Sequence, residues 1–264
     1  MNRYVMCRPE HFDVVSTLNP WMDPSVPVSR TTAIEQWEHL VDLYEELGHE
    51  VDLVQPGVGL PDMVFAANAG VAIDNRMMTA VMWSVERRPE EAHYRKHFDR
   101  AGFDDVFIPE HVNEGEGDFL FTGEVLLAGT GFRTDPRSHL EAQRYFDVEV
   151  VTLQLVDPRW YHLDTALFSI DRDVVVWYPG AFDPAGVAEL RRRFPDGIEA
   201  TEADALAFGL NSTADNRHVV MPASAQALAA RISDAGFDVH TVDLSELLKA
   251  GGSVKCCTLD LNTH

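Results

Sequence analysis

The sequence predicts a mixed α/β propeller made of five repeats, each with the order strand, strand, helix, strand. Amphipathic helical segments recur five times along the 264 residues, with a mean period of roughly fifty residues. A short extended run follows each helical segment, and two β-rich runs joined by a turn precede four of them. The helical segments are expected at residues 31–48, 87–101, 137–146, 184–194 and 223–235.

The first helical segment has the clearest periodicity. Its apolar residues follow the spacing of a helix with one buried face, and Gly48 stands where a C-terminal cap is expected. These apolar residues are Ile34, Trp37, Leu40, Val41, Tyr44 and Leu47. The strands expected after the five helical segments are GHEVDLVQP, GFDDVFIPE, FDVEVVTLQ, DGIEATEAD and GFDVHTVDL.

Four hairpins are expected within the chain, and a fifth is expected to be split between its two ends. The split hairpin would pair VKCCTLDL with RYVMCRP, which closes the repeats into a ring. No linker rich in Gly, Pro or Ser interrupts the repeats, so residues 1–264 are expected to form one domain with the hairpins lining an axial channel. The other hairpins are FAANAGVAI-DN-RMMTAVM, GDFLFT-GE-VLLAGT, HLDTALFSI-DRD-VVVWYP and AFGLNSTA-DN-RHVVMP.

The composition excludes several classes of function. No apolar run approaches the roughly 18 residues that span a bilayer, and the N-terminus lacks the pattern of a signal peptide. We therefore expect a soluble, cytoplasmic protein without a membrane partner. The formal net charge of −22 would repel a phosphate backbone, so nucleic acid is not an expected partner. The cysteines Cys7, Cys256 and Cys257 are too few for a disulfide framework.

Polar residues recur once per repeat, at one end of the expected hairpins. In a propeller, equivalent positions of the repeats meet near the axis, whatever their separation in the sequence. The intervals 68→118, 118→164, 164→211 and 211→256 are 50, 46, 47 and 45 residues. We therefore expect a site formed by Asn68, the stretch from Glu114 to Asp118, His162, Asp164, Asn211 and Cys256.

A thiol, an imidazole and several carboxylates together suit the chemistry of a guanidinium group. A cysteine beside a histidine is a nucleophile with a proton shuttle, and carboxylates bind cationic nitrogen through charge-assisted hydrogen bonds. Cys7 lies in the apolar closing strand and is expected to be structural. Because neighbouring strand residues face opposite ways, either Cys256 or Cys257 faces the channel, but not both. The preceding glycines, Gly251 and Gly252, permit close backbone approach.

Five motifs resemble those of the guanidine-modifying, or pentein, superfamily: PDMVFAANAG, EGEGDFLF, TGFRTD, WYHLDTALF and GGSVKCCTL. This superfamily includes dimethylarginine dimethylaminohydrolase, arginine deiminase, arginine dihydrolase and the amidinotransferases. The resemblance covers essentially the whole chain and implies the α/β-propeller fold. It also implies a small cationic, arginine-like substrate.

The resemblance assigns the reacting groups. The family nucleophile follows the glycine pair, which is Cys256 here, and the family histidine of the HL motif is His162. Asp164 matches the aspartate that holds the guanidinium in the deiminases. The family's E-G-G-D run is one residue longer here, as E-G-E-G-D, which leaves Glu114 or Glu116 as the catalytic acid. We favour Glu114, because a bulge after it would absorb the extra residue.

A second departure concerns the substrate. Where deiminases have an aspartate after F-x-R, this chain has Asn68, as in the arginine dihydrolases, although proteins of this pattern are also interpreted as dimethylargininases. Arg87 and Arg133 resemble the arginines that hold the α-carboxylate of the substrate. Asp62 is expected either to hold the guanidinium or to stabilise a turn. The expected substrate-binding residues are thus Asn19, Asp62, Phe65, Asn68, Arg87, Glu116, Asp118, Arg133, Asp164 and Asn211.

These assignments predict a hydrolase that forms a covalent thiouronium on Cys256, with no cofactor and no metal. His162 protonates the departing amine and then deprotonates water. The expected reaction converts arginine to ornithine, CO2 and ammonia, and the main alternative converts dimethylarginine to citrulline and dimethylamine. Lesser alternatives are an amidinotransferase, a non-catalytic binder of arginine-like cations, and a metal site at His162, Asp164, Glu116 and Asp118, which lacks a second histidine at metal spacing.

Overall fold

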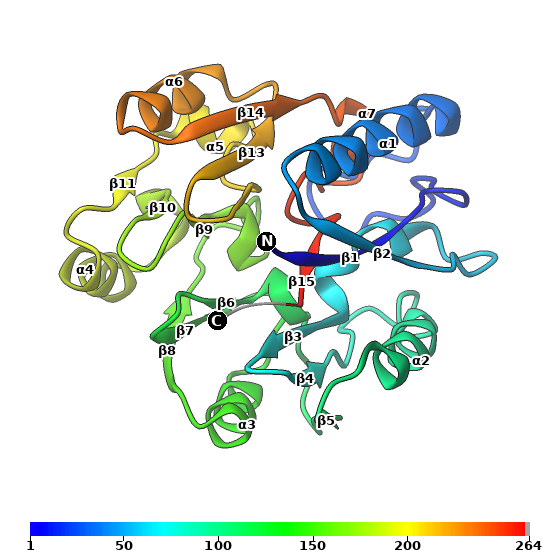
Figure 1. The fold of residues 1–264 in the computed structure, drawn as a ribbon, viewed down its shortest axis with the longest axis horizontal. Helices are drawn as coiled ribbons and strands as arrows, with labels where there is room; N and C mark the ends of the chain where they lie inside the picture. Colours follow the sequence, from blue (N-terminus) through cyan, green and yellow to red (C-terminus); the bar gives the residue numbers. More distant parts are fainter. Residues whose placement is uncertain (262–264) are drawn as a thin grey trace.

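Residues 1–261, which this computed structural model describes, form five three-stranded sheets arranged around a common centre (Figure 1). In each sheet the middle strand pairs antiparallel with one neighbour and parallel with the other. Helices lie on the outside of this ring. The prediction of a five-repeat α/β propeller is therefore confirmed.

The strands are short, with two to six residues each. They are β1 (Arg3–Cys7), β2 (Glu50–Val54), β3 (Gly70–Ile73), β4 (Arg76–Thr79), β5 (Asp105–Phe107), β6 (Phe119–Phe121), β7 (Val125–Thr130), β8 (Glu149–Gln154), β9 (Leu167–Ser169), β10 (Val175–Trp177), β11 (Ile198–Glu199), β12 (Thr213–Ala214), β13 (His218–Pro222), β14 (Asp238–Val242) and β15 (Leu259–Asp260).

The five predicted helices connect the hairpins to the parallel strands. Ser29, Asp135 and Asp183 cap three of them, and the side chain of each accepts a hydrogen bond from a backbone N–H of the first turn. Gly48 follows the first helix with a φ of +87°, as the sequence indicated. The helices are α1 (Arg30–Glu46), α2 (Glu90–Ala101), α3 (Pro136–Phe146), α4 (Pro184–Arg193) and α6 (Gln226–Asp234), with α5 (Glu202–Leu206) and α7 (Ser245–Leu248) not predicted.

The two ends of the chain close the ring. Strand β15 pairs antiparallel with β1, with Tyr4 opposite Asp260 and Val5 opposite Leu259. The Asn2 side-chain amide donates to the Asp260 carboxylate at 2.9 Å. The prediction that the fifth hairpin is split between the termini is therefore confirmed.

The segments that carry the expected site are not strands, and this part of the sequence analysis is wrong. Asn68 lies in the 3-10 turn η2 (Ala66–Ala69), and similar turns, η3 (Gly115–Gly117) and η4 (Leu163–Thr165), precede β6 and β9. Backbone hydrogen bonds within each turn pair its N–H and C=O groups. In η3, for example, Gly117 N donates to Glu114 O at 3.0 Å. The chain must bend sharply to enter each hairpin, which a continuous strand cannot do.

The same correction applies to the two adjacent cysteines. Cys256 and Cys257 lie in a turn, because only Leu259–Asp260 of the expected strand VKCCTLDL pairs with β1. Side chains alternate between faces only in a strand, so alternation does not determine which of the two cysteines faces the pocket. Cys7, in contrast, is buried in β1 as expected.

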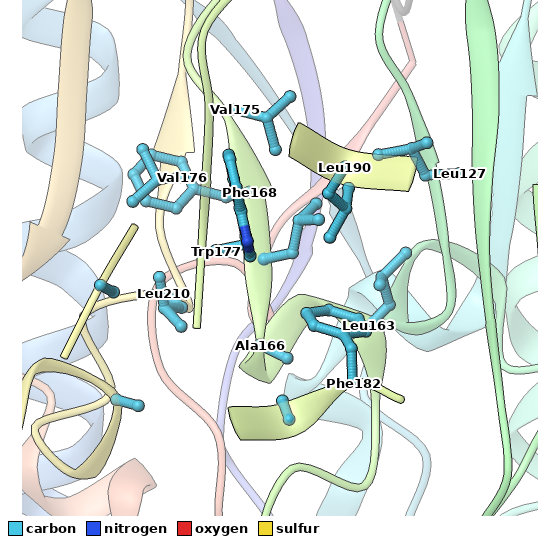
Figure 2. Packing of buried hydrophobic residues seen from close by; sticks show 14 of the residues in the cluster. Leu127, Leu163, Ala166, Phe168, Val175, Val176, Trp177, Phe182, Leu190 and Leu210 are labelled. Carbon is cyan, nitrogen blue, oxygen red and sulfur yellow. The ribbon is translucent and has the colours of Figure 1, made fainter. Parts of the chain in front are cut away.

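Apolar side chains fill the space between neighbouring blades and under the outer helices. The largest cluster surrounds β9 and β10, where Trp177 and Phe168 pack with Leu190 of α4 (Figure 2). This packing supports the turn η4, because Leu163 and Ala166 belong to the same cluster. Among residues 1–261, no helix is long and apolar enough to cross a membrane.

Candidate active site

A narrow pocket opens at the centre of the ring, where the turns that precede the hairpins meet. Most of the residues expected from the repeat spacing lie in it or directly beside it. The pocket is lined by Leu18, Asn19, Met22, Asp62, Phe65, Asn68, Arg87, Arg133, Tyr161, His162, Ala250, Gly251 and Cys256.

The Cys256 thiol is held by two polar side chains. Its Sγ lies 3.2 Å from Asp164 Oδ2, and the Asn211 amide donates to it at 3.1 Å. The Asn211 carbonyl oxygen also accepts from the backbone N–H groups of Ser253 and Cys256, at 3.0 and 3.1 Å. Asn211 therefore fixes the turn that presents the thiol, and it does not line the pocket itself. Cys257 is buried and also lies outside the lining.

The surroundings of Cys256 keep it as a thiol in the unliganded site. Burial and the neighbouring Asp164 raise the pKa of Cys256 well above its ordinary value. Burial also raises the pKa of Asp164, to about 6. A cation bound beside these two groups would stabilise both the carboxylate and the thiolate, so the site is set up to activate its nucleophile when a cation binds.

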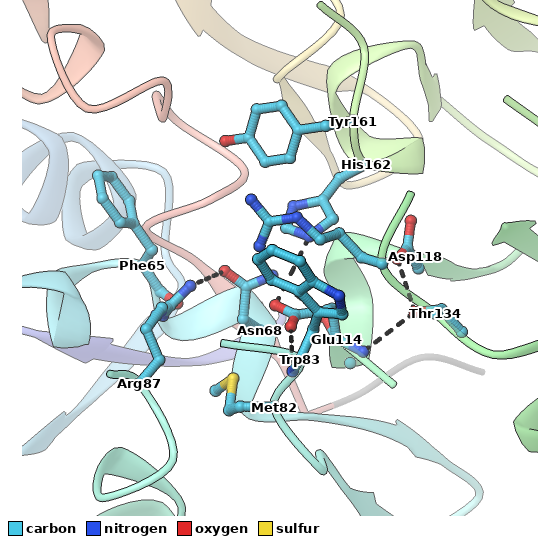
Figure 3. Close-up of polar contacts among 12 residues, drawn as sticks. Phe65, Asn68, Met82, Trp83, Arg87, Glu114, Asp118, Thr134, Tyr161 and His162 are labelled. Carbon is cyan, nitrogen blue, oxygen red and sulfur yellow. Dashed lines mark hydrogen bonds and ion pairs between the residues drawn. The ribbon is translucent and has the colours of Figure 1, made fainter. Parts of the chain in front are cut away.

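Glu114 lies beside the imidazole of His162, with Oε2 and Nε2 3.5 Å apart (Figure 3). The other oxygen of Glu114 accepts from the backbone N–H of Trp83 at 2.8 Å. Burial opposes ionisation, but His162 and the nearby Arg133 and Arg87 lower the pKa of Glu114 to about 2. Neither Glu114 Oε2 nor His162 Nε2 has a hydrogen-bond partner among the described residues. A bound guanidinium would supply one.

The other two acids of the E-G-E-G-D run point elsewhere. Glu116 forms an ion pair with Lys255 at 2.6 Å and accepts from the backbone N–H of Asp260 at 3.0 Å. The oxygens of Asp118 accept from Thr134 at 2.6 Å and from the backbone N–H of Leu163 at 3.0 Å. The turn η3 thus places Glu114 beside the imidazole and directs Glu116 away from the pocket.

Arg87 and Asn68 form one wall of the pocket. Asn68 Oδ1 accepts from Arg87 at 2.7 Å, and Asn68 Nδ2 donates to the backbone oxygen of Glu114 at 3.2 Å. Arg87 is also paired with Glu90, at 2.9 Å. Asp62 lies in the lining with Oδ1 unpartnered among the described residues, and burial raises the pKa of Asp62.

Arg133 lies at the mouth of the pocket between two aromatic rings. Its guanidinium carbon is 4.5 Å from the ring centre of Trp83 and 5.0 Å from that of Tyr161. Arg133 also donates to the backbone oxygen of Leu18. Asn19, from the same segment, donates to the backbone oxygen of Ala250 at 3.0 Å. These bonds hold the segment 18–22 over the pocket.

The glycine pair is required for this closure. A Cβ atom at Gly252 would lie 2.3 Å from the Phe65 ring, and one at Gly251 would lie 2.8 Å from the Asn19 amide. Gly251 also has a φ of +76°, which strongly favours glycine. The expectation that the two glycines permit close backbone approach is confirmed.

Several residues of the site have no counterpart in the sequence analysis. Trp83 and Tyr161 enclose Arg133, Glu90 pairs with Arg87, and Lys255 pairs with Glu116. These residues have no equivalents at the corresponding positions of the other repeats, so the regular spacing does not identify them. Tyr161 and Lys255 did lie inside two of the quoted motifs, directly before His162 and Cys256.

The position of Cys256 predicts selective labelling. An electrophilic amidine should modify Cys256, because its cationic group fits the buried acids, and should leave Cys257 unmodified. Peptide mass spectrometry measures both sites. Cys256→Ser should abolish labelling, and the matched control Cys257→Ser should retain it. Labelling of Cys257 in the unchanged protein would contradict this assignment.

The buried Asp164 predicts how stability depends on pH. Its pKa, raised by burial to about 6, exceeds its ordinary value of 3.8, so this carboxyl takes up protons on folding. Its contribution to stability is present below pH 3.8 and is lost as the pH rises through about 6. The melting temperature of the unliganded protein should therefore fall between about pH 4 and about pH 6.5.

Asp164→Asn should show a smaller fall over this range, measured by calorimetry, because the amide does not titrate. The exposed Asp234→Asn is the matched control and should keep the slope of the unchanged protein. Equal slopes for Asp164→Asn and the unchanged protein would show that Asp164 does not carry this pH dependence.

Comparison with known proteins identifies relatives over nearly the whole chain. Residues 16–263 match the family model of eukaryotic N,N dimethylarginine dimethylhydrolase. The N(G),N(G)-dimethylarginine dimethylaminohydrolase of Mycobacterium tuberculosis is 48% identical over 260 residues, which cover 98% of this chain and 86% of that protein. The bifunctional arginine dihydrolase/ornithine cyclodeaminase ArgZ of Synechocystis is 38% identical over 97% of this chain, but this chain spans 37% of that protein.

Solved structures show the same architecture. The N-terminal domain of cyanobacterial ArgZ, a variant covalently bound to a reaction intermediate, has a TM-score of 0.95 at 37% identity and covers 99% of this chain and 98% of that domain. A dimethylarginine dimethylaminohydrolase adduct, with a TM-score of 0.81 at 19% identity and coverage of 98% and 99%, shows the shared fold. The chain therefore belongs to the dimethylarginine dimethylaminohydrolase family, whose members have the pentein fold, and it is a hydrolase of guanidino C–N bonds.

Proposed function

We propose that this enzyme is an arginine dihydrolase, which converts arginine to ornithine, CO2 and ammonia. The observation that carries this choice is the polar surroundings of the reacting groups. Asp164 and Asn211 contact the thiol, and Glu114 faces the imidazole. Buried carboxylate oxygens of this kind need N–H donors, and two methyl groups on a guanidino nitrogen remove two of them.

The covalent chemistry follows from the positions of Cys256 and His162. As the guanidinium binds, the proton of the Cys256 thiol passes to His162, and Sγ forms a bond to the guanidinium carbon. The C–N bond to a terminal nitrogen breaks, and His162 gives that nitrogen the proton with which it leaves as ammonia. A thiouronium remains on Sγ. His162 then takes a proton from water, the resulting hydroxide attacks the same carbon, and the C–S bond breaks, which frees citrulline and the thiol. In a second round Cys256 attacks the ureido carbon, the remaining terminal nitrogen leaves as ammonia, and a thiocarbamate remains on Sγ. Water hydrolyses this thiocarbamate to a carbamate, which decomposes to ornithine and CO2.

Glu114 orients the substrate and balances its charge. Its low pKa keeps it ionised beside His162, so it stabilises both the guanidinium and the imidazolium. We assign Arg133 to the α-carboxylate of the substrate, because the rings of Trp83 and Tyr161 hold its guanidinium at the pocket mouth. Asn19 and Asp62 line the same pocket, and we assign them to the amino-acid end of the substrate.

The main alternative is a dimethylargininase, which the similarity to the Mycobacterium tuberculosis enzyme favours. That reaction uses the same thiol and imidazole but releases dimethylamine and stops at citrulline. Mass spectrometry after separate incubation with arginine and with asymmetric dimethylarginine distinguishes the two. We expect ornithine and ammonium from arginine. Dimethylamine from dimethylarginine, with arginine unchanged, would establish the alternative instead.

The choice of Glu114 as the catalytic acid gives a prediction about rate. Glu114→Gln keeps the shape of the side chain and removes its charge, so turnover of arginine should fall at least about a hundredfold. Steady-state assays of ammonium release measure this. The matched change Glu116→Gln should reduce turnover by less than about tenfold but lower the melting temperature, because Lys255 is left buried without its partner. A larger loss of turnover in Glu116→Gln would reverse the assignment.

A further inference from the structure

We propose that Glu90 is a positioning residue for the second hydrolysis. Acting through Arg87, it fixes the Asn68 amide so that an N–H of Asn68, rather than its carbonyl oxygen, faces the substrate pocket. The inference rests on the proposed function, because a dihydrolase must bind a neutral ureido group after it has bound a guanidinium.

Glu90 is the first residue of α2 and is 1% exposed. Its two oxygens accept from Arg87 Nε at 3.1 Å and from Arg87 Nη2 at 2.9 Å, which is the fork geometry of a strong ion pair. Arg87 Nη2 also donates to the backbone oxygen of Asp62 at 3.1 Å. These contacts fix the plane of the guanidinium and direct Nη1 toward Asn68.

Arg87 determines the orientation of the Asn68 amide. A guanidinium has no acceptor, so the Asn68 atom 2.7 Å from Nη1 must be the carbonyl oxygen. The amide nitrogen then lies 3.2 Å from the backbone oxygen of Glu114, which can only accept. If the amide were flipped, its NH2 group would face an N–H of Arg87, and its oxygen would face the backbone oxygen of Glu114. Both contacts would be repulsive. Asn68 lines the pocket, and with its oxygen and one N–H occupied, it has one N–H left to donate to a group bound there.

This orientation suits the second substrate better than the first. A guanidinium offers only donors, and it pairs with the carboxylates beside Cys256 and His162. A ureido group carries a carbonyl oxygen, which accepts from the free N–H of Asn68. The fixed amide therefore favours retention of the ureido product for another round of hydrolysis. Without the hold of Glu90 on Arg87, the amide can rotate and this donor is lost.

The test is the ratio of citrulline to ornithine formed from arginine. Glu90→Gln replaces the charged fork by a neutral contact, so this ratio should rise at least about tenfold, as expected for the loss of one charge-assisted hydrogen bond. Arginine consumption should fall by a smaller factor. Asp99→Asn, an exposed acid on the same helix, is the matched control and should keep the ratio of the unchanged protein.

A double-mutant cycle separates positioning from a general structural effect. In an Asn68→Ala background, Glu90→Gln should leave the product ratio unchanged, because the group through which it acts is gone. An equal increase in both backgrounds would overturn the proposal. If Glu90→Gln does not fold, Glu90→Asp keeps the charge but shortens the reach to Arg87; it should still raise the ratio, and an unchanged ratio would overturn the proposal.

The outcome for the unchanged protein distinguishes this inference from the proposed function. If it forms no ornithine from arginine, the proposed function fails, and this inference fails with it. If it forms ornithine and Glu90→Gln keeps the same product ratio, only the inference fails.

Discussion

The burial of negative charge around one thiol is the constraint on which the rest of the site depends. Acidic side chains converge at the centre of the ring, and an isolated buried carboxylate is strongly unfavourable. Most of them have compensating partners: Glu90 has Arg87, Glu116 has Lys255, and Asp118 has two donors. Near Cys256 and His162, Asp164 Oδ1 and Glu114 Oε2 have no hydrogen-bond partner among the described residues, and a bound cation would supply one. A guanidinium therefore completes the electrostatics of the site and supplies the electrophile.

The propeller fold makes this arrangement possible. Each blade buries its apolar side chains between its neighbours and its outer helix, which leaves the inner turns free to carry polar groups. The 3-10 turns satisfy their own backbone groups, so the side chains remain available for the pocket. Pairing of β15 with β1 then ties the turn that carries Cys256 to the start of the chain. The nucleophile thus depends on closure of the ring.

The sequence was sufficient to predict the blades, and to predict that Asn68, His162 and Cys256 meet in one pocket, because both recur with the same spacing. It could not predict that η2, η3 and η4 are turns, since short apolar runs look the same in strands and in tight turns. The choice between Glu114 and Glu116 depended on how η3 absorbs one extra residue, with Gly115 at a φ of +52°. Glu90 and Trp83 reach the site through tertiary contacts alone, which no spacing reveals.

Burial and the neighbouring Asp164 keep Cys256 protonated until a guanidinium binds, which is the property on which the proposed chemistry depends. The ultraviolet absorbance of the thiolate, taken as a difference from Cys256→Ser, measures this directly at neutral pH. The account predicts no thiolate band in the unliganded protein and a band of about one thiolate per chain when a non-hydrolysable arginine analogue saturates the site. A full thiolate band in the unliganded protein, unchanged by the analogue, would contradict it.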